Sequence, residues 1–107
     1  MIKEKAVRIG VEVSMIQEAA GRIRQMERVF DVLREMADRN PAAIFEDAAF
    51  REMLRSLVQY YEGGQWRKDY ELDEMGLLPQ NLKRGVLAQD AVYDFLDQLK
   101  PYINISE

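Results

Sequence analysis

The chain has no cysteine, no histidine and no threonine, and only three of its 107 residues are serine. The missing cysteine and histidine exclude disulfides, zinc-finger sites, thiolate nucleophiles, imidazole bases and haem attachment. The hydroxyl groups of Ser14, Ser56 and Ser106 leave few candidate nucleophiles, and no nucleophile–base pair accompanies them. We therefore expect a protein that is not an enzyme and has no cofactor.

An excess of basic residues and a long apolar run are also missing. The formal net charge is −4, which argues against binding to nucleic acid or to anionic lipid, since both depend on Lys and Arg. No apolar stretch approaches the roughly 20 residues that span a bilayer. Charged residues interrupt residues 1–13, so this segment lacks the apolar region of a secretory signal. We expect a cytoplasmic protein whose partner is neither nucleic acid nor membrane.

The apolar residues that are present suffice for one folded domain. Hydrophobic residues make up 48% of the chain and charged residues 32%, a balance typical of a soluble globular protein. The patterns described below predict an all-α bundle of four helices, two long and two short, with a possible short strand at each terminus. Residues 1–14 are expected to be an extension, and residues 15–107 the helical domain.

The first long helix is predicted to begin at Ser14 and to end before Asn40-Pro41. Ser14 and Gln17 have the spacing of a capping box, and the residue before a proline avoids the α conformation. Before this helix, residues 7–13 alternate apolar and polar as in a half-buried strand. Within the helix, apolar residues recur every three or four positions: Ile16, Ala19, Ile23, Met26, Phe30, Leu33 and Ala37.

Three further helices are expected. The second runs from Pro41 or Asp47 to Glu62 and ends at Gly63-Gly64, and its narrow polar strip predicts a place in the middle of the bundle. The third covers residues 65–75. The last covers residues 88–100, ends at Pro101 and exposes Asp90, Asp94 and Asp97, and the tail at residues 102–106 alternates like a strand.

The densest polar feature is a cluster of four carboxylates, Asp69, Glu71, Asp73 and Glu74. Its beginning resembles a calcium loop, but the required Gly and the bidentate Glu are replaced by Glu74 and Gln80. One interpretation is a site for a hard cation on these four residues. The other is structural, with Asp69 and Asp73 accepting hydrogen bonds from Lys83 and Arg84 and so fixing the connection at residues 79–87 against the third helix.

Aromatic residues surround the Gly63-Gly64 turn. Tyr60 and Tyr61 precede it, and Trp66 and Tyr70 follow it on one helix face. Packing of the rings into the corner between two helices is the simpler interpretation. The alternative is an exposed patch that anchors a partner, because Tyr and Trp are enriched at binding hot spots.

The same stretch resembles a family of small bacterial proteins, domain of unknown function 4298. The residues that carry this resemblance are Tyr60-Tyr61, Trp66, Asp69, Glu71, Asp73-Glu74, Gly76, Leu78-Pro79 and residues 82–87, Leu-Lys-Arg-Gly-Val-Leu. The resemblance extends over roughly residues 15–99. It implies a small all-helical bacterial protein, and it supplies no catalytic residue to transfer.

These observations favour a non-enzymatic module that binds another protein or a second copy of itself. Alternatives are a divalent-cation site or metal-dependent hydrolase on the four carboxylates, and an acidic mimic of nucleic acid that binds a basic protein through Asp90, Asp94 and Asp97. The residues expected to form an interaction surface or a structural network are Tyr60, Tyr61, Trp66, Asp69, Tyr70, Asp73, Glu74, Lys83 and Arg84.

Overall fold

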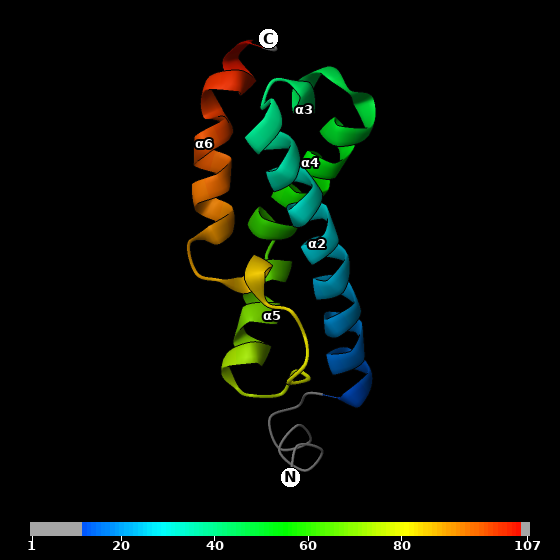
Figure 1. The fold of residues 1–107 in the computed structure, drawn as a ribbon. Coiled ribbons are helices and arrows are strands. Elements are labelled where there is room, and N and C mark those ends of the chain that lie inside the picture. The colour runs from blue at the N-terminus through cyan, green and yellow to red at the C-terminus, as the bar shows by residue number, and fades with distance from the viewer. Residues whose placement is uncertain (1–11, 106–107) are drawn as a thin grey trace.

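The computed structural model describes residues 12–105, with side chains through Tyr102, and this part of the chain is all-α (Figure 1). Between residues 12 and 105, four helices have ten residues or more, as predicted, and no strand occurs. The elements in chain order are α2 (Val13–Arg39), α3 (Ala43–Glu46), α4 (Ala48–Glu62), α5 (Gln65–Glu74), the 3-10 turn η1 (Gly85–Leu87) and α6 (Ala91–Ile105).

The central element is α2, along which the other elements lie (Figure 1). All seven residues of the predicted apolar stripe are buried, together with Ala20 and Glu27. The helix contacts α3, α4, α5 and η1. Its 27 residues span about 40 Å at 1.5 Å per residue, so a single apolar face can serve all of these neighbours.

The prediction that residues 47–62 form the middle of the bundle is wrong. Only Leu54, Leu57 and Tyr60 of α4 are buried, whereas Phe50 and Met53 are half-buried. The narrow polar strip predicted that the other sides of the helix are buried. The small side chains of Ala48 and Ala49 are nevertheless exposed at the start of the helix. The helix packs on α2, α3 and α5, and its exposed residues include the predicted polar strip.

The start of α2 also differs from the prediction. The helix begins at Val13 with Glu12 as its N-cap and no side-chain cap hydrogen bond, so Ser14 lies inside the helix and forms no capping box. Of the strand predicted over residues 7–13, residues 7–11 lie outside the described part, and Val13 is helical. The predicted end is confirmed, with Arg39 as the last helical residue and Asn40 as C-cap.

The turns around α4 and α5 follow from their sequence. The Asp47 carboxylate accepts hydrogen bonds from the backbone N–H groups of Ala49 (2.8 Å) and Phe50 (3.2 Å), which caps α4. After α4, Gly64 takes φ +97°, a left-handed conformation that disfavours side chains. The chain bends at this turn, and α5 continues from α4 along α2 toward the first turns of α2 (Figure 1).

The last helix begins three residues later than predicted and continues past its predicted end. It runs from Ala91 to Ile105 with Pro101 inside, so the predicted stop at Pro101 and the predicted strand at residues 102–106 are both wrong over the described residues. Proline removes one backbone donor without preventing α geometry after it. A short strand would need a neighbouring strand, and the described chain provides none.

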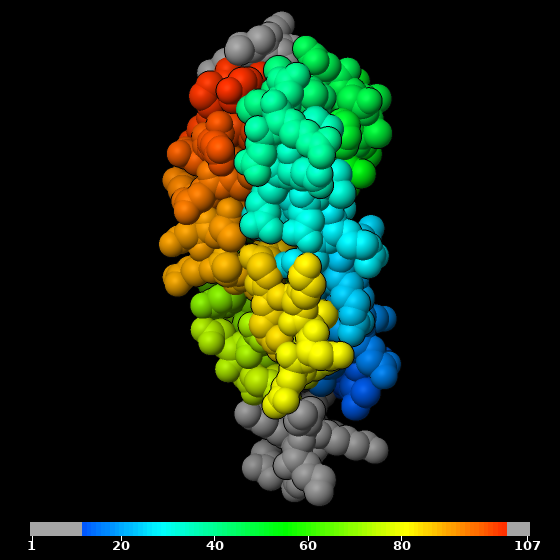
Figure 2. All heavy atoms as spheres, viewed as in Figure 1, coloured from blue at the N-terminus to red at the C-terminus, as the bar shows by residue number. Residues whose placement is uncertain are grey.

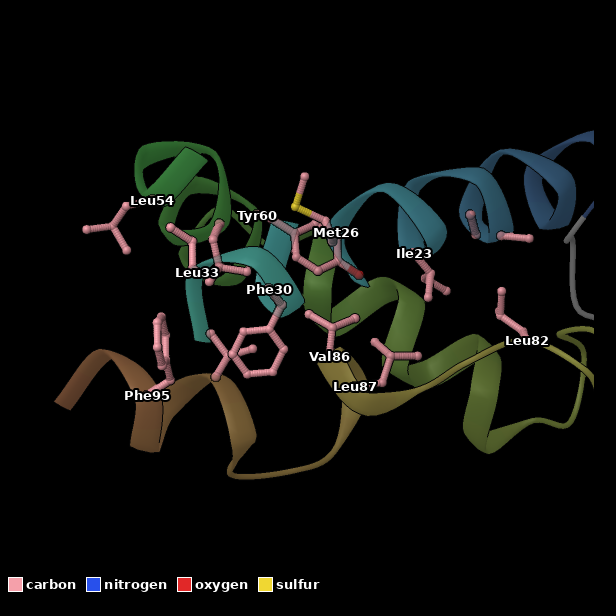
Figure 3. Packing of buried hydrophobic residues seen from close by; sticks show 14 of the residues in the cluster. Ile23, Met26, Phe30, Leu33, Leu54, Tyr60, Leu82, Val86, Leu87 and Phe95 are labelled. Carbon is pink, nitrogen blue, oxygen red and sulfur yellow. The ribbon is translucent and has the colours of Figure 1, made fainter. Parts of the chain in front are cut away.

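The core lies where α2, α4, η1 and α6 meet (Figure 3). The rings of Phe30 and Phe95 meet edge to face with centroids 5.5 Å apart, joining α2 to α6. Val92, Phe95 and Leu99 of α6 are buried as predicted, and Leu96 is half-buried. In residues 12–105, no helix is both long enough and apolar enough to cross a membrane.

The central position of α2 predicts the effect of a cavity at Ile23, which is fully buried. We expect Ile23→Ala to lower the free energy of unfolding by about 3 kcal/mol, because the surrounding helices cannot close the space. Val32→Ala, at a 39% exposed position of the same helix, should change it by less than about 0.5 kcal/mol. Urea denaturation followed by circular dichroism compares them, and equal effects would contradict the central role of α2.

Candidate functional site

Asp69, one of the predicted site residues, has no solvent exposure, and its carboxylate links α5 to α2. Its Oδ1 accepts a hydrogen bond from Nη2 of Arg22 at 2.6 Å, and its Oδ2 accepts one from Nε at 3.1 Å. The hydroxyl of Tyr60 donates to Oδ2 at 2.8 Å. These contacts join α2, α4 and α5, and we call the three residues the Asp69 network.

The partner predicted for Asp69 is therefore wrong. Lys83 or Arg84 was expected to donate to this carboxylate, whereas Arg22, 47 positions away, binds it. Nothing in the local pattern identifies Arg22, since Glu18 lies one turn away on the same helix as an equally suitable partner. Tertiary packing makes the choice, because Asp69 is buried and only a nearby cation can compensate for its lost hydration.

The Asp69 network changes the acidity of its members. Burial, reinforced by the hydrogen bond to Asp69 and its negative charge, raises the pKa of Tyr60 far above the ordinary tyrosine value. The same carboxylate raises the pKa of Arg22, mainly through its hydrogen bond. Tyr60 thus remains a neutral donor and Arg22 a cation at every physiological pH.

The second predicted ion pair, between Asp73 and Arg84, is confirmed. Nε of Arg84 donates to Oδ1 of Asp73 at 2.7 Å. The remaining guanidinium N–H groups donate to backbone carbonyls of the connection, at 2.7 Å to Pro79 and Leu82 and at 3.3 Å to Gln80. Arg84 thus stabilises the fold of the connection through these carbonyls and links the connection to α5 through Asp73.

Lys83 does not join this arrangement. Its Nζ lies 3.6 Å from the carboxylate of Asp31 on α2, and both side chains are exposed. An exposed pair of this kind contributes little to stability. Of the two cations predicted to fix the connection, only Arg84 has a structural role.

Glu27, which is not among the predicted site residues, is a buried carboxylate of α2 that accepts a hydrogen bond from the backbone N–H of Val86. The Nε1–H group of Trp66 donates to the carbonyl of the same residue at 2.8 Å. Val86 is thereby held from both sides. A Cβ on Gly85 would lie 3.0 Å from the Glu27 carboxylate, so the absent side chain permits this close approach. Glu27 lies beside the apolar stripe, which gave no indication of its burial.

The aromatic residues around the Gly63-Gly64 turn pack on one another. Trp66 stacks on Tyr70 with ring centroids 5.1 Å apart, and Tyr61 meets Trp66 edge-on at 5.2 Å. A hydrogen bond to Glu74 raises the pKa of Tyr70. All but the buried Tyr60 are half-buried, so this cluster is mainly a packed corner with accessible ring edges.

The four carboxylates of the acidic cluster do not converge. Asp69 is bound to Arg22, Asp73 is bound to Arg84, and Glu71 and Glu74 are exposed. Between residues 12 and 105, no three acidic side chains are placed to hold a metal ion. The placement of these residues therefore gives no support to the alternative of a cation site.

An open groove of about 340 Å³ lies beside the Asp69 network. One wall is formed by the first turns of α2, and the other by the length of α5. We call it the α2–α5 groove. Its apolar lining comes from Met15, Leu72 and Met75, and the Arg22–Asp69 pair contributes to its wall. Met15 is 47% exposed and Met75 38% exposed. The groove can accept an apolar side chain, but its lining has no hydroxyl, thiol or imidazole nucleophile.

The role of Arg84 predicts an asymmetry between two neighbouring cations. We expect Arg84→Ala to lower the free energy of unfolding by about 2 kcal/mol, because Asp73 and the carbonyls of the connection lose a charged donor. Arg84→Lys should recover less than half of this loss, since an ammonium cannot reproduce the guanidinium fork. Lys83→Ala is the control and should change stability by less than about 0.5 kcal/mol. Denaturant unfolding measures all three, and a neutral Arg84→Ala would contradict the structural role.

The raised pKa of Tyr60 predicts a loss of stability at alkaline pH. Above about pH 10, tyrosine ionises in the unfolded chain while Tyr60 stays protonated in the folded one, so the unfolded state is favoured. Tyr60→Phe should cost about 1 kcal/mol at neutral pH and should show a smaller further loss at about pH 10.5. Unfolding midpoints at both pH values test this, and an unchanged alkaline loss in the variant would contradict it.

Comparison with known proteins places the chain in a family. No curated protein and no solved structure matches it. The family described as Domain of unknown function (DUF4298) matches residues 23–104, which include every residue of the Asp69 network except Arg22, the acidic cluster, the connection and most of α6. The match begins later and ends later than the 15–99 expected from the resemblance. The chain belongs to this family of domains of unknown function, DUF4298.

Proposed function

We propose that the protein is a non-enzymatic protein-interaction module and that the α2–α5 groove is its binding surface. The observation that carries this proposal is the exposure of Met15 and Met75 at a groove whose wall contains the ion pair between the half-buried Arg22 and the buried Asp69. Methionine side chains adapt to varied apolar surfaces and are common at binding sites.

The hydrogen bonding of the buried polar side chains supports a rigid binding surface. Within residues 12–105, every buried polar side-chain atom has a hydrogen-bond partner. None of these buried groups needs a substrate or an ion to complete its hydrogen bonding. Because the Asp69 network fixes α2 against α5, the two walls of the groove keep their separation, and a partner need not order them on binding.

The lining indicates the chemistry of the partner. An apolar side chain of the partner would lie against Met15 and Leu72, while the carboxylates of Glu18 and Glu71 flank the groove beside Lys68. We therefore propose a partner segment with an apolar anchor next to a basic residue. A groove of about 340 Å³ suits one or two side chains rather than a whole helix face.

Site-specific photocrosslinking tests this function. We expect a benzoylphenylalanine at position 15, introduced in the native cell, to give a discrete adduct with one protein. The same residue at position 32, which is 39% exposed, should not give this adduct. The purified partner should then bind Met15→Glu at least tenfold more weakly than the natural chain, since a carboxylate would replace the apolar contact with the anchor and would lose hydration on binding.

Val32→Glu is the matched control, because it adds the same charge to another exposed position of α2. It should bind the partner like the natural chain. Identical adducts from both positions, or equal binding by the two Glu variants, would contradict the assignment of the groove.

A further inference from the structure

A second groove, about 240 Å³ in volume, lies between α2 and the connection, away from the α2–α5 groove. We call it the basic groove, and its cations are Arg24, Arg28 and Lys83. Arg24 and Arg28 are one helical turn apart, a spacing at which like charges repel. In the described part of the chain, neither has a carboxylate within ion-pair distance, whereas Arg22, Arg34, Arg39 and Arg84 each have one.

The carboxylates that line the basic groove do not supply the missing partner. Glu27 is buried and accepts the hydrogen bond from Val86. Asp31 is bound by Arg34 at 2.8 Å and approached by Lys83 at 3.6 Å. Two guanidinium groups therefore remain available to an external anion.

A surface of opposite charge lies on α6 and on the residue that precedes it. Its residues are Asp90, Tyr93, Asp94 and Asp97, which we call the acidic patch. Tyr93 is 55% exposed, more than any other large hydrophobic residue between residues 12 and 102. Asp97 is paired with Lys100 at 3.1 Å, while Asp90 and Asp94 have no cation within ion-pair distance in the described part. An exposed tyrosine among carboxylates is typical of an interface anchor.

We propose that the protein self-associates head to tail, with the acidic patch of one copy docked in the basic groove of the next. Arg24 and Arg28 of α2 are four residues apart, which is about 6 Å along the helix. Asp90, the residue before α6, and Asp94 have the same sequence spacing, and the backbone N–H of Asp94 donates to the carbonyl of Asp90 at 2.8 Å. Each guanidinium can form a two-bond fork with a carboxylate, as Arg22 does with Asp69 within the chain. Tyr93 supplies the ring face on which a guanidinium stacks, as Arg34 stacks on Phe30 at 4.4 Å.

The two surfaces belong to different parts of the same copy. The side of α6 that includes Asp94 borders Phe30, Arg34 and Ala37 in the second half of α2, whereas Arg24 and Arg28 precede this region. Figures 1 and 2 show α6 on one flank and the connection beside the earlier turns of α2. A contact between different surfaces is heterologous and leaves one of each free at the ends, so it builds chains or rings rather than a symmetric dimer.

The net charge sets the conditions for the test. Each copy carries −4, so whole copies repel one another at low salt. At about 0.1 M salt, this repulsion is screened beyond about 10 Å while contacting pairs are screened less. We expect sedimentation velocity at this ionic strength to show a mass that rises with concentration.

Two neutralising variants make the test specific. Arg24→Gln/Arg28→Gln retains the acidic patch and loses the groove, and Asp90→Asn/Tyr93→Ala/Asp94→Asn retains the groove and loses the patch. We expect each alone to be monomeric, with at least tenfold weaker self-association than the natural chain. Their equimolar mixture should form a 1:1 pair that grows no further, because only one intact contact is available.

Arg55→Gln/Arg67→Gln is the matched control, since it removes two positive charges at exposed positions outside the basic groove. It should self-associate like the natural chain, and circular dichroism should give the same helicity for all variants. A natural chain that is monomeric at every concentration, a mixture that stays monomeric, or a control that loses association would each overturn the proposal. A monomer whose acidic patch binds a basic protein instead would also overturn it.

This proposal does not rest on the α2–α5 groove. Met15→Glu should leave self-association unchanged, and Arg24→Gln/Arg28→Gln should leave the position-15 crosslink unchanged. Either function can therefore fail without the other.

Discussion

The burial of one carboxylate constrains the arrangement of three helices. Asp69 lies fully out of water on α5, so its charge must be compensated by donors from the elements that cover it. Arg22 supplies the charge from α2, and Tyr60 adds a hydroxyl from α4. A buried pair of this kind adds little net stability over an apolar contact, but removing one member leaves an uncompensated charge. We infer that the Asp69 network acts mainly by fixing how α2, α4 and α5 are aligned.

The connection after α5 is constrained by the same principle, applied to backbone groups. Glu27 and Trp66 hold the two polar groups of Val86, and Arg84 binds carbonyls within the connection. A segment with little regular structure can pack on the core only when its backbone groups have partners. The connection forms one wall of the basic groove. The Asp69 network forms part of a wall of the α2–α5 groove. The shape of both grooves therefore depends on these internal hydrogen bonds.

Local patterns predicted the elements better than their arrangement. Spacing of apolar residues gave the buried face of α2, and Gly63-Gly64 gave the turn after α4, because both depend on residues a few positions apart. The placement of residues 47–62 at the centre failed, since a narrow polar strip does not show how many neighbours a helix has. The prediction that the last helix ends at Pro101 was wrong, because a proline lowers the stability of a helix but does not prevent helical residues before and after it.

The sequence by itself determined an all-α domain and its family, and it predicted that Arg84 binds one of two nearby carboxylates, of which Asp73, eleven positions away, is the partner found. It also determined the chemistry available, because residues absent from the chain cannot be supplied by folding. Only the tertiary structure decided that Arg22 holds Asp69, that Glu27 is buried and that Arg24 and Arg28 lack internal partners. Each of these depends on contacts between residues distant in the chain, and the electrostatic cost of burial, rather than local spacing, selects them.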